Sequence, residues 1–354
     1  LENGRFTQRA ILRFAAGTAV LWSVAFLSFY PFAANYVTGY SSLSAWQGSY
    51  THASRYLIVW GLFLFLIIPH LAREFRDWSN RLTPKRLRQS ESVGWLAVAG
   101  LIVLVALIFW MWTQQYWVAP IVLPLIVLAG LLSLRRSLPT PRRIVLVLIS
   151  AALFLTLFVE VAVLDGDIGR MNTVFKFYLQ AWLMLSVVGG LTAVWTYPAI
   201  RQRKKMHTIW SIALGVLLFA AVLYPVLATG AKWRIRMNPD APHTLDGMAF
   251  MPYVEYGERG GQTLSLASDY EAINWIQRNI DGSPVIMEAH SDNPYRSIGN
   301  RVAMYTGLPS VIGWDWHQRQ QRAAAPDSGV MARITDVNAF YNAPDIDFAN
   351  FLID

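Results

Sequence analysis

The chain has 354 residues, of which 55% are hydrophobic and 15% are charged, and its mean hydropathy is +0.34. Soluble domains carry about 25% charged residues, so this composition leaves too little charge to cover a water-facing surface. The sequence contains no cysteine, which excludes disulfide bonds and thiolate chemistry.

The net charge of +8 is distributed unevenly along the chain. Residues 1–230 contain 20 lysines and arginines and 7 aspartates and glutamates, a balance of +13. Residues 231–354 contain 10 and 15 of these, a balance of −5. The basic excess lies in loops between apolar stretches, where it suits anionic lipid headgroups. We therefore expect membrane lipids, and no nucleic acid, as partners.

Apolar stretches recur through residues 1–230. A bilayer core about 30 Å thick requires roughly 20 apolar residues in a helix, and seven stretches approach that length, so the sequence predicts a mainly α, polytopic bundle of about seven transmembrane helices. The second stretch is short and contains Pro69; we expect it either to begin nearer His52 or to lie tilted in the bilayer. The fourth contains two prolines and is expected to be kinked. The stretches are 14–34, 56–71, 94–112, 118–134, 144–164, 177–197 and 210–228.

Basic residues in the loops predict the orientation. Seventeen lysines and arginines precede the first stretch or follow the second, fourth and sixth, whereas the alternate loops contain only Arg55, Arg170 and, directly before the sixth stretch, Lys176. By the positive-inside rule, the N-terminal end is cytoplasmic and the chain after residue 228 is extracytoplasmic.

Residues 231–354 predict a small extracytoplasmic α/β domain. Ser268 and Glu271 are spaced as a capping box that opens a helix. Because the first residue is Leu1 and the chain stops within an apolar run, we expect a fragment in which this domain is incomplete. The expected elements are a helix ending at Gly282, strands at 284–287 and 310–312, and a helix beginning near Asp345.

Ionisable residues gather between the fifth and sixth stretches. Charged groups at membrane depth are costly, so they normally face the bundle interior and pair with one another. We predict a polar site in which Glu160, Asp165 and Asp167 are the catalytic carboxylates. Asp165 and Asp167 would hold a divalent metal, Mg²⁺ or Mn²⁺. The substrate would contact Arg170, which suits a phosphate, and Asn172, Lys176 and Gln180, which share one helix face.

A structural interpretation of the same residues stays open. In it, Glu160 and Lys176 form an ion pair that pins two helices together, while Asp165 and Asp167 cap the turn.

Two further polar groups lie nearer the C-terminus. The first follows the seventh stretch, where its cations would either meet lipid phosphates or serve as juxtamembrane anchors. The second lies at strand ends and loops, which often carry function, although isolated loop residues are often only solvated. The groups are Lys232, Arg234 and Arg236, and Glu288, His290, Arg301, Asp315 and His317.

Three motifs resemble a known family when taken in this order. They are Asp165–Tyr178, the pair Ser268–Ile276 and Gly282–Glu288, and Tyr305–Trp314. Together they resemble the YYY (DUF2298) family of multi-pass membrane proteins, whose layout is similar to that of C-type glycosyltransferases. The family's Tyr-Tyr-Tyr-x-Gly signature is not in this sequence. Glu288-Ala-His290 stands where oligosaccharyltransferases have Trp-Trp-Asp-Tyr-Gly.

This resemblance implies a glycosyltransferase that takes a sugar from a polyprenyl-phosphate donor at the outer membrane face. Arg170, Lys176 and Arg234 would hold the donor phosphate, and the C-terminal domain would present the acceptor. A transporter or proton-coupled permease, with Glu160 and Lys176 as a gated pair, is the first alternative. A non-catalytic membrane scaffold is the second. The sequence contains no P-loop, dinucleotide fingerprint, HExxH or GxSxG motif, which counts against other enzyme classes.

Overall fold

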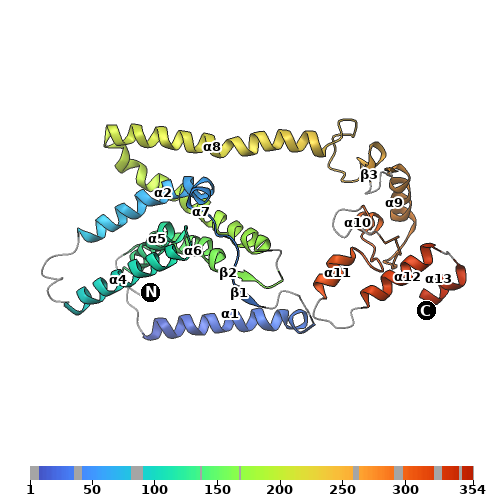
Figure 1. The fold of residues 1–354 in the computed structure, drawn as a ribbon, viewed down its shortest axis with the longest axis horizontal. Helices are drawn as coiled ribbons and strands as arrows, with labels where there is room; N and C mark the ends of the chain where they lie inside the picture. The colour runs from blue at the N-terminus through green and yellow to red at the C-terminus, as the bar shows by residue number, and fades with distance from the viewer. Residues whose placement is uncertain are drawn as a thin grey trace. The chain divides into compact units, whose positions relative to one another are not determined.

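The computed structural model is described here for residues 8–35, 42–80, 91–135, 138–166, 169–257, 263–290, 298–322, 329–342 and 345–353. Helices dominate these residues (Figure 1). The chain divides into two compact units. The first comprises Leu1–Tyr30 with Tyr40–Pro225, and the second comprises Pro31–Gly39 with Val226–Asp354.

Long apolar helices confirm the mainly α, polytopic membrane fold. Within the described part of the chain, six helices are long and apolar enough to cross a membrane. A seventh apolar helix, α5, has 15 residues and falls short of the roughly 20 that a bilayer core requires. The helices are α1 (Gln8–Asn35), α2 (Ala53–Ser79), α4 (Glu91–Thr113), α5 (Ala119–Ser133), α6 (Thr140–Val161), α7 (Met171–Arg201) and α8 (Lys204–Arg236).

The second span is longer than its apolar stretch, whereas the fourth agrees with the expectation to within one residue at each end. Helix α2 has 27 residues and continues past Pro69, so it is not short. It begins, as expected, next to His52, whose ring accepts a hydrogen bond from the Ser54 amide. Helix α5, with 15 residues, is the shortest of the seven; the turn before it places Gln115 at a φ of 67°.

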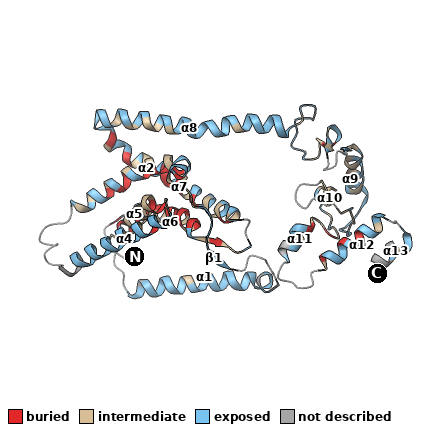
Figure 2. Ribbon diagram, in the orientation of Figure 1, coloured by how far each residue is buried: buried red, intermediate tan, exposed pale blue. Residues whose placement is uncertain are grey.

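The core of the first unit lies among α2, α5, α6 and α7, which pack on one another in neighbouring pairs. Buried residues gather on these helices in Figure 2. Tyr56 of α2 and Thr156 of α6 share a buried hydrogen bond of 2.9 Å between their hydroxyls. Gly189 of α7 lets α2 approach closely, since a Cβ there would lie 3.4 Å from Leu66. In contrast, the apolar windows of α1 and α8 bury none of their residues, as expected for helices that face lipid.

A short antiparallel ladder fixes the segment before α2 against the end of α6. Strand β1 (Leu43–Ala45) pairs with β2 (Ala162–Leu164), with Ser44 opposite Val163. Backbone hydrogen bonds from Trp46 to Val161 and from Asp165 to Ser42, both 2.9 Å, extend the ladder at its two ends. The segment that leads into α2 therefore lies beside the turn between α6 and α7.

The second unit contains mostly helices, and its described strands are short. The predicted strands at 284–287 and 310–312 are reduced to a single parallel bridge between Ile286 and Ser310. The final helix begins near Asp345, as expected. The elements are η1 (Met251–Tyr253), the hairpin β3 (Glu255–Gly257) and β4 (Thr263–Ser265), α9 (Ala267–Asn279), α10 (Arg301–Thr306), α11 (Asp315–Gln321), α12 (Val330–Asn342) and α13 (Ile346–Ile353).

The prediction of a capping box at Ser268 is wrong. Helix α9 begins one residue earlier, at Ala267, and its N-cap Leu266 has no side-chain hydrogen bond. The acidic residue of the first turn, Asp269, instead forms a 2.9 Å ion pair with Arg301 of α10. The first turn of α9 is thus tied to a residue distant in sequence. The helix also ends at Asn279, before Gly282.

Candidate functional site: a groove beside a buried ion pair

Glu160, in the last turn of α6, is fully buried at the centre of the candidate site. Its Oε2 accepts the backbone N–H of Thr51 at 2.9 Å and lies 3.0 Å from Nη1 of Arg170. Arg170, which directly precedes α7, also donates to the Val159 carbonyl at 2.8 Å and to the Thr51 hydroxyl at 3.0 Å. Its guanidinium lies 5.3 Å from the ring centre of Trp46. These contacts join the segment before α2 to the ends of α6 and α7.

The ion pair corrects the partner expected for Glu160. The pair is formed with Arg170 instead of Lys176, and only 14% of the Arg170 side chain is exposed. A buried carboxylate without its cation is strongly destabilising, so Arg170 is required where it lies. Oε1 of Glu160 is buried and has no hydrogen-bond partner in the described part of the chain. One acceptor position of this carboxylate is therefore unused by the protein.

Asp165 lies in the turn after β2, and residues at and next to β1, the strand that pairs with β2, hold its side chain. Its carboxylate accepts hydrogen bonds from the hydroxyls of Ser42 and Ser44. These two bonds lower the pKa of Asp165 below the usual carboxyl value, so the group stays ionised and can only accept.

The proposed metal pair stays a prediction because Asp167 lies outside the described residues. Among the residues that are described, no group of three or more His, Cys, Asp or Glu side chains gathers. Of the two carboxylates proposed as metal ligands, only Asp165 is described, and its carboxylate accepts hydrogen bonds from Ser42 and Ser44.

A groove of about 680 Å³ opens between α2 and α7 next to the buried ion pair. Two guanidinium groups, Arg55 and Arg170, line it together with Thr51. Arg55 is exposed and makes no hydrogen bond or ion pair with any residue that the structure describes. Apart from these, the lining is apolar or aromatic: Tyr56, Val59, Trp60, Met171, Val174, Phe175, Tyr178, Leu179 and Trp182.

Arg55 was not predicted as a site residue, although a signal for it exists in the sequence. It, Arg170 and Lys176 are the three basic residues that depart from the positive-inside pattern of the loops. The structure brings two of these exceptions, Arg55 and Arg170, to the same groove. Their proximity could not be inferred from spacing, because 114 positions separate them and the pairing of α2 with α7 is a tertiary contact.

The three residues predicted to share a face of α7 do not line the groove. Asn172 is half-buried, and Lys176 and Gln180 are exposed. The groove instead uses the neighbouring face, which Val174 and Tyr178 occupy. The substrate contacts expected of Asn172, Lys176 and Gln180 remain predictions.

The structure brings Glu288, His290 and Asp315 of the second unit around one small cavity. The cavity holds about 10 Å³, which is about the volume that one water molecule needs. Both oxygens of Glu288 accept backbone N–H groups at the start of α10, from Val302 and Ala303, at 2.9 Å. These bonds give Glu288 a structural task. This small cavity leaves no room for a substrate, whereas Glu288 and Arg301 also line a separate cavity of about 550 Å³.

The other second-unit candidates are placed as follows. His290 Nε2 lies 3.7 Å from Asp315, whose other oxygen pairs with Arg319 at 2.7 Å. His317 packs its ring against Trp314, with the ring centres 5.6 Å apart. Arg234 lies in the last turn of α8 and donates to the Gly230 carbonyl at 3.3 Å. Their substrate contacts remain predictions.

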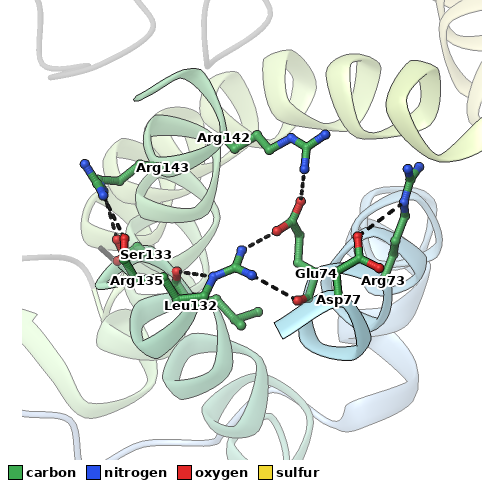
Figure 3. A network of polar contacts seen from close by, with 8 residues as sticks. All are labelled: Arg73, Glu74, Asp77, Leu132, Ser133, Arg135, Arg142 and Arg143. Carbon is green, nitrogen blue, oxygen red and sulfur yellow. Dashed lines mark hydrogen bonds and ion pairs between the residues drawn. The ribbon is translucent and has the colours of Figure 1, made fainter. Parts of the chain in front are cut away.

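A second buried carboxylate, Glu74, lies near the other end of α2 and was missed by the sequence analysis (Figure 3). Its side chain pairs with Arg135, in the turn between α5 and α6, and with Arg142 at 3.2 Å. Arg135 also donates to the Glu74 carbonyl at 3.2 Å, and Arg143 donates to the Ser133 carbonyl at 3.0 Å. The signal was an acidic residue three positions after a predicted span, in a loop whose charges are mostly basic.

Apolar helices with ion pairs buried between them define a multi-pass integral membrane protein. The chain belongs to the family of uncharacterised membrane proteins DUF2298, whose model matches residues 3–185, just over half of the chain. This matched region contains Glu160 and every residue that lines the groove. No curated protein and no solved structure matches the chain.

Proposed function

We propose that the chain is the membrane part of a glycosyltransferase that takes a sugar from a polyprenyl-phosphate donor at the non-cytoplasmic face. The observation that carries the proposal is the groove between α2 and α7, which combines apolar walls with two guanidinium groups. An amphiphile with an anionic head and a long hydrocarbon tail has the same two properties.

The walls of the groove suit an isoprenoid chain. Val59 of α2 and Phe175, Leu179 and Trp182 of α7 present hydrocarbon and aromatic surface to it. Since the groove is open between two membrane helices, a lipid would enter it laterally from the bilayer without leaving apolar surroundings. This surface selects for a tail and gives no specificity for a sugar.

The charges in the groove favour a phosphate group. Arg170 is compensated by Glu160, whereas Arg55 has no protein counter-charge among the described residues, so the groove retains one uncompensated cation. Guanidinium groups bind phosphate oxygens through paired hydrogen bonds. In glycosyl transfer, the bond between the anomeric carbon and the phosphate oxygen breaks, and negative charge develops on the leaving phosphate. A cation fixed beside that oxygen stabilises the transition state.

The carboxylates and the second unit complete the proposal. The lowered pKa of Asp165 suits it to orient an acceptor hydroxyl or a metal ion, and leaves proton removal to Asp167 or Glu160. Lys176 and Arg234 are further candidates for the donor phosphate. The C-terminal unit would present the acceptor. The non-cytoplasmic placement rests on the distribution of basic residues between the loops.

The test is sugar transfer by the full-length protein in proteoliposomes that contain a radiolabelled polyprenyl-phosphate sugar. We expect Arg55→Gln to lower transfer at least about tenfold, because one charged contact to a phosphate contributes about 1.5–3 kcal/mol. Arg55→Lys should keep part of the activity, since the charge remains but the paired geometry is lost. Arg201→Gln, at an exposed position in the last turn of α7 outside the groove, is the matched control, and equal transfer by Arg55→Gln and the wild type would refute the groove as donor site.

The transporter alternative draws on the buried pair of Glu160 and Arg170, since intramembrane ion pairs also occur in proton relays. The same proteoliposomes separate the two functions. Flux of a solute without a covalent product would favour transport. The absence of both flux and sugar transfer would favour a non-catalytic membrane scaffold.

A further inference from the structure

The chain that follows α8 folds back onto the last turn of that helix. The ring of His243 meets the ring of Trp233 edge-on, with centres 5.6 Å apart. Both residues line a cavity of about 730 Å³, together with Arg236, Met237 and Leu245. The segment from Met237 to Phe250, the interfacial loop, is thus held beside the end of α8.

Local hydrogen bonds give the interfacial loop a defined conformation. The Asn238 side chain donates to the Tyr253 carbonyl at 2.6 Å and accepts the amide of Asp240 at 2.9 Å. The Asp246 carboxylate accepts the amide of Met248 at 2.9 Å. A loop ordered in this way positions its exposed side chains reproducibly.

The length of α8 sets the depth of this loop relative to a bilayer. The predicted span ends at Ala228, and Trp233 follows five residues later, about 7.5 Å further along the helix. The headgroup layer on each side of the hydrocarbon core is about 5–7 Å thick. Trp233 therefore falls at the membrane interface, where tryptophan is enriched.

Four exposed side chains of this surface are apolar. Leu245 is 105% exposed, Ile235 is 82% exposed, and Trp233 and Met237 are 53% and 55% exposed. A cluster of this kind in water marks an interaction surface. The last turn of α8 also carries Arg234 and Arg236.

The cations complement an anionic headgroup. Lys232 and Arg236 are exposed and make no hydrogen bond or ion pair within the described residues. Basic residues beside a span attract anionic lipids, and their long stems lie along apolar surface. Apolar tips and basic residues together form the composition of an interfacial membrane contact.

We propose that the interfacial loop lies in the headgroup layer of the bilayer that α8 spans, with the Trp233 ring in that layer, Leu245 directed toward the upper acyl carbons, and Lys232 and Arg236 on anionic phospholipid phosphates. The surface continues directly from a membrane helix, which is why lipid, and not a second protein, occupies it. This contact keeps the start of the second unit at the membrane. It does not depend on the glycosyltransferase proposal.

The absence of cysteine makes the test direct, since a single introduced cysteine can be labelled selectively. Leu245→Cys in the full chain is labelled with an environment-sensitive fluorophore and reconstituted in phosphatidylcholine vesicles whose lipids are brominated just below the headgroup. Arg278→Cys, on the exposed face of α9, is the control. We expect the lipid to quench the Leu245 label at least about twofold more, and aqueous iodide to quench it less.

A second comparison tests the cations. Adding phosphatidylglycerol to the vesicles should increase the quenching of the label at position 245 by brominated lipid. The double variant Lys232→Gln with Arg236→Gln should abolish this increase. Met237→Cys provides a second labelling position should the Leu245 variant fail to fold. Labels at 245 and 237 that are quenched by iodide as strongly as the label at 278, and not by brominated lipid, would overturn the proposal.

Discussion

A buried glutamate pairs with arginine at each end of the helical bundle, but the surroundings of the two ion pairs differ. Near one end of α2, the Glu74 side chain is 4% exposed and both of its oxygens are paired with arginines, Arg135 and Arg142. Beside the other end, Glu160 is fully buried with one arginine, one backbone amide and one oxygen without a hydrogen bond. Only the second arrangement borders an open groove, in the part of the chain that the structure describes.

The comparison shows that a buried ion pair does not by itself indicate a site. At Glu74 the arginines are committed to the carboxylate and to helix-end carbonyls, so the cluster stabilises the turn between α5 and α6 against α2. Arg170 pairs with the Glu160 carboxylate through Nη1, and it also lines a groove that another cation, Arg55, lines. The adjacent groove and the unpaired cation Arg55 distinguish the candidate site at Glu160 from the structural cluster around Glu74.

The largest expected effect follows loss of Arg170. Arg170→Met leaves Glu160 buried without a counter-charge, so we expect the free energy of unfolding to fall by about 3–5 kcal/mol. Denaturant titration of the protein in detergent micelles measures the change.

A double variant separates electrostatics from packing. Glu160→Met with Arg170→Met removes both charges and should recover most of the lost stability, because apolar residues of similar volume replace buried pairs at little cost. If the double variant is as unstable as Arg170→Met, the loss comes from packing or from the Thr51 contacts instead.

A smaller effect is expected at the other end. Glu74→Gln keeps the shape of the side chain but leaves Arg135 without its carboxylate, and Arg142 is 44% exposed and can be hydrated. We expect a loss of about 2 kcal/mol, below the value for Arg170→Met. The same titration measures it, and groove binding should be unchanged. Loss of polyprenyl-phosphate binding in this variant would contradict the assignment of a structural role to the Glu74 cluster and a binding role to the groove.

The smallest structural effect concerns Asp165 and depends on pH. Its pKa lies below the usual carboxyl value because Ser42 and Ser44 donate to the ionised form. The stabilisation is therefore complete above the usual carboxyl pKa of about 4 and is lost as the pH falls through the lowered value. Hydrogen exchange at the β1 amides should accelerate over that acidic range in the wild type. In Asp165→Asn the exchange should be faster at neutral pH and independent of this titration.

The sequence was sufficient for the features that depend on local composition. Hydropathy located the apolar helices, and the cost of charge at membrane depth singled out Glu160 and Arg170. What depends on tertiary contacts was not accessible. The partner of Glu160 required knowing that the chain turns back at residue 170, and the role of Arg55 required the pairing of α2 with α7. At Ser268, the local pattern did not reveal that α9 begins already at Ala267.

Photo-cross-linking of a polyprenyl-phosphate probe to the reconstituted full chain, followed by peptide mapping, tests the central claim most directly. We predict labelling of α2 and α7 peptides that line the groove, and a reduction of at least about tenfold in Arg55→Gln. Because Arg55 is exposed, the free energy of unfolding of this variant should change by less than about 0.5 kcal/mol. Undiminished labelling in a folded Arg55→Gln protein, or labelling confined to other helices, would contradict the account.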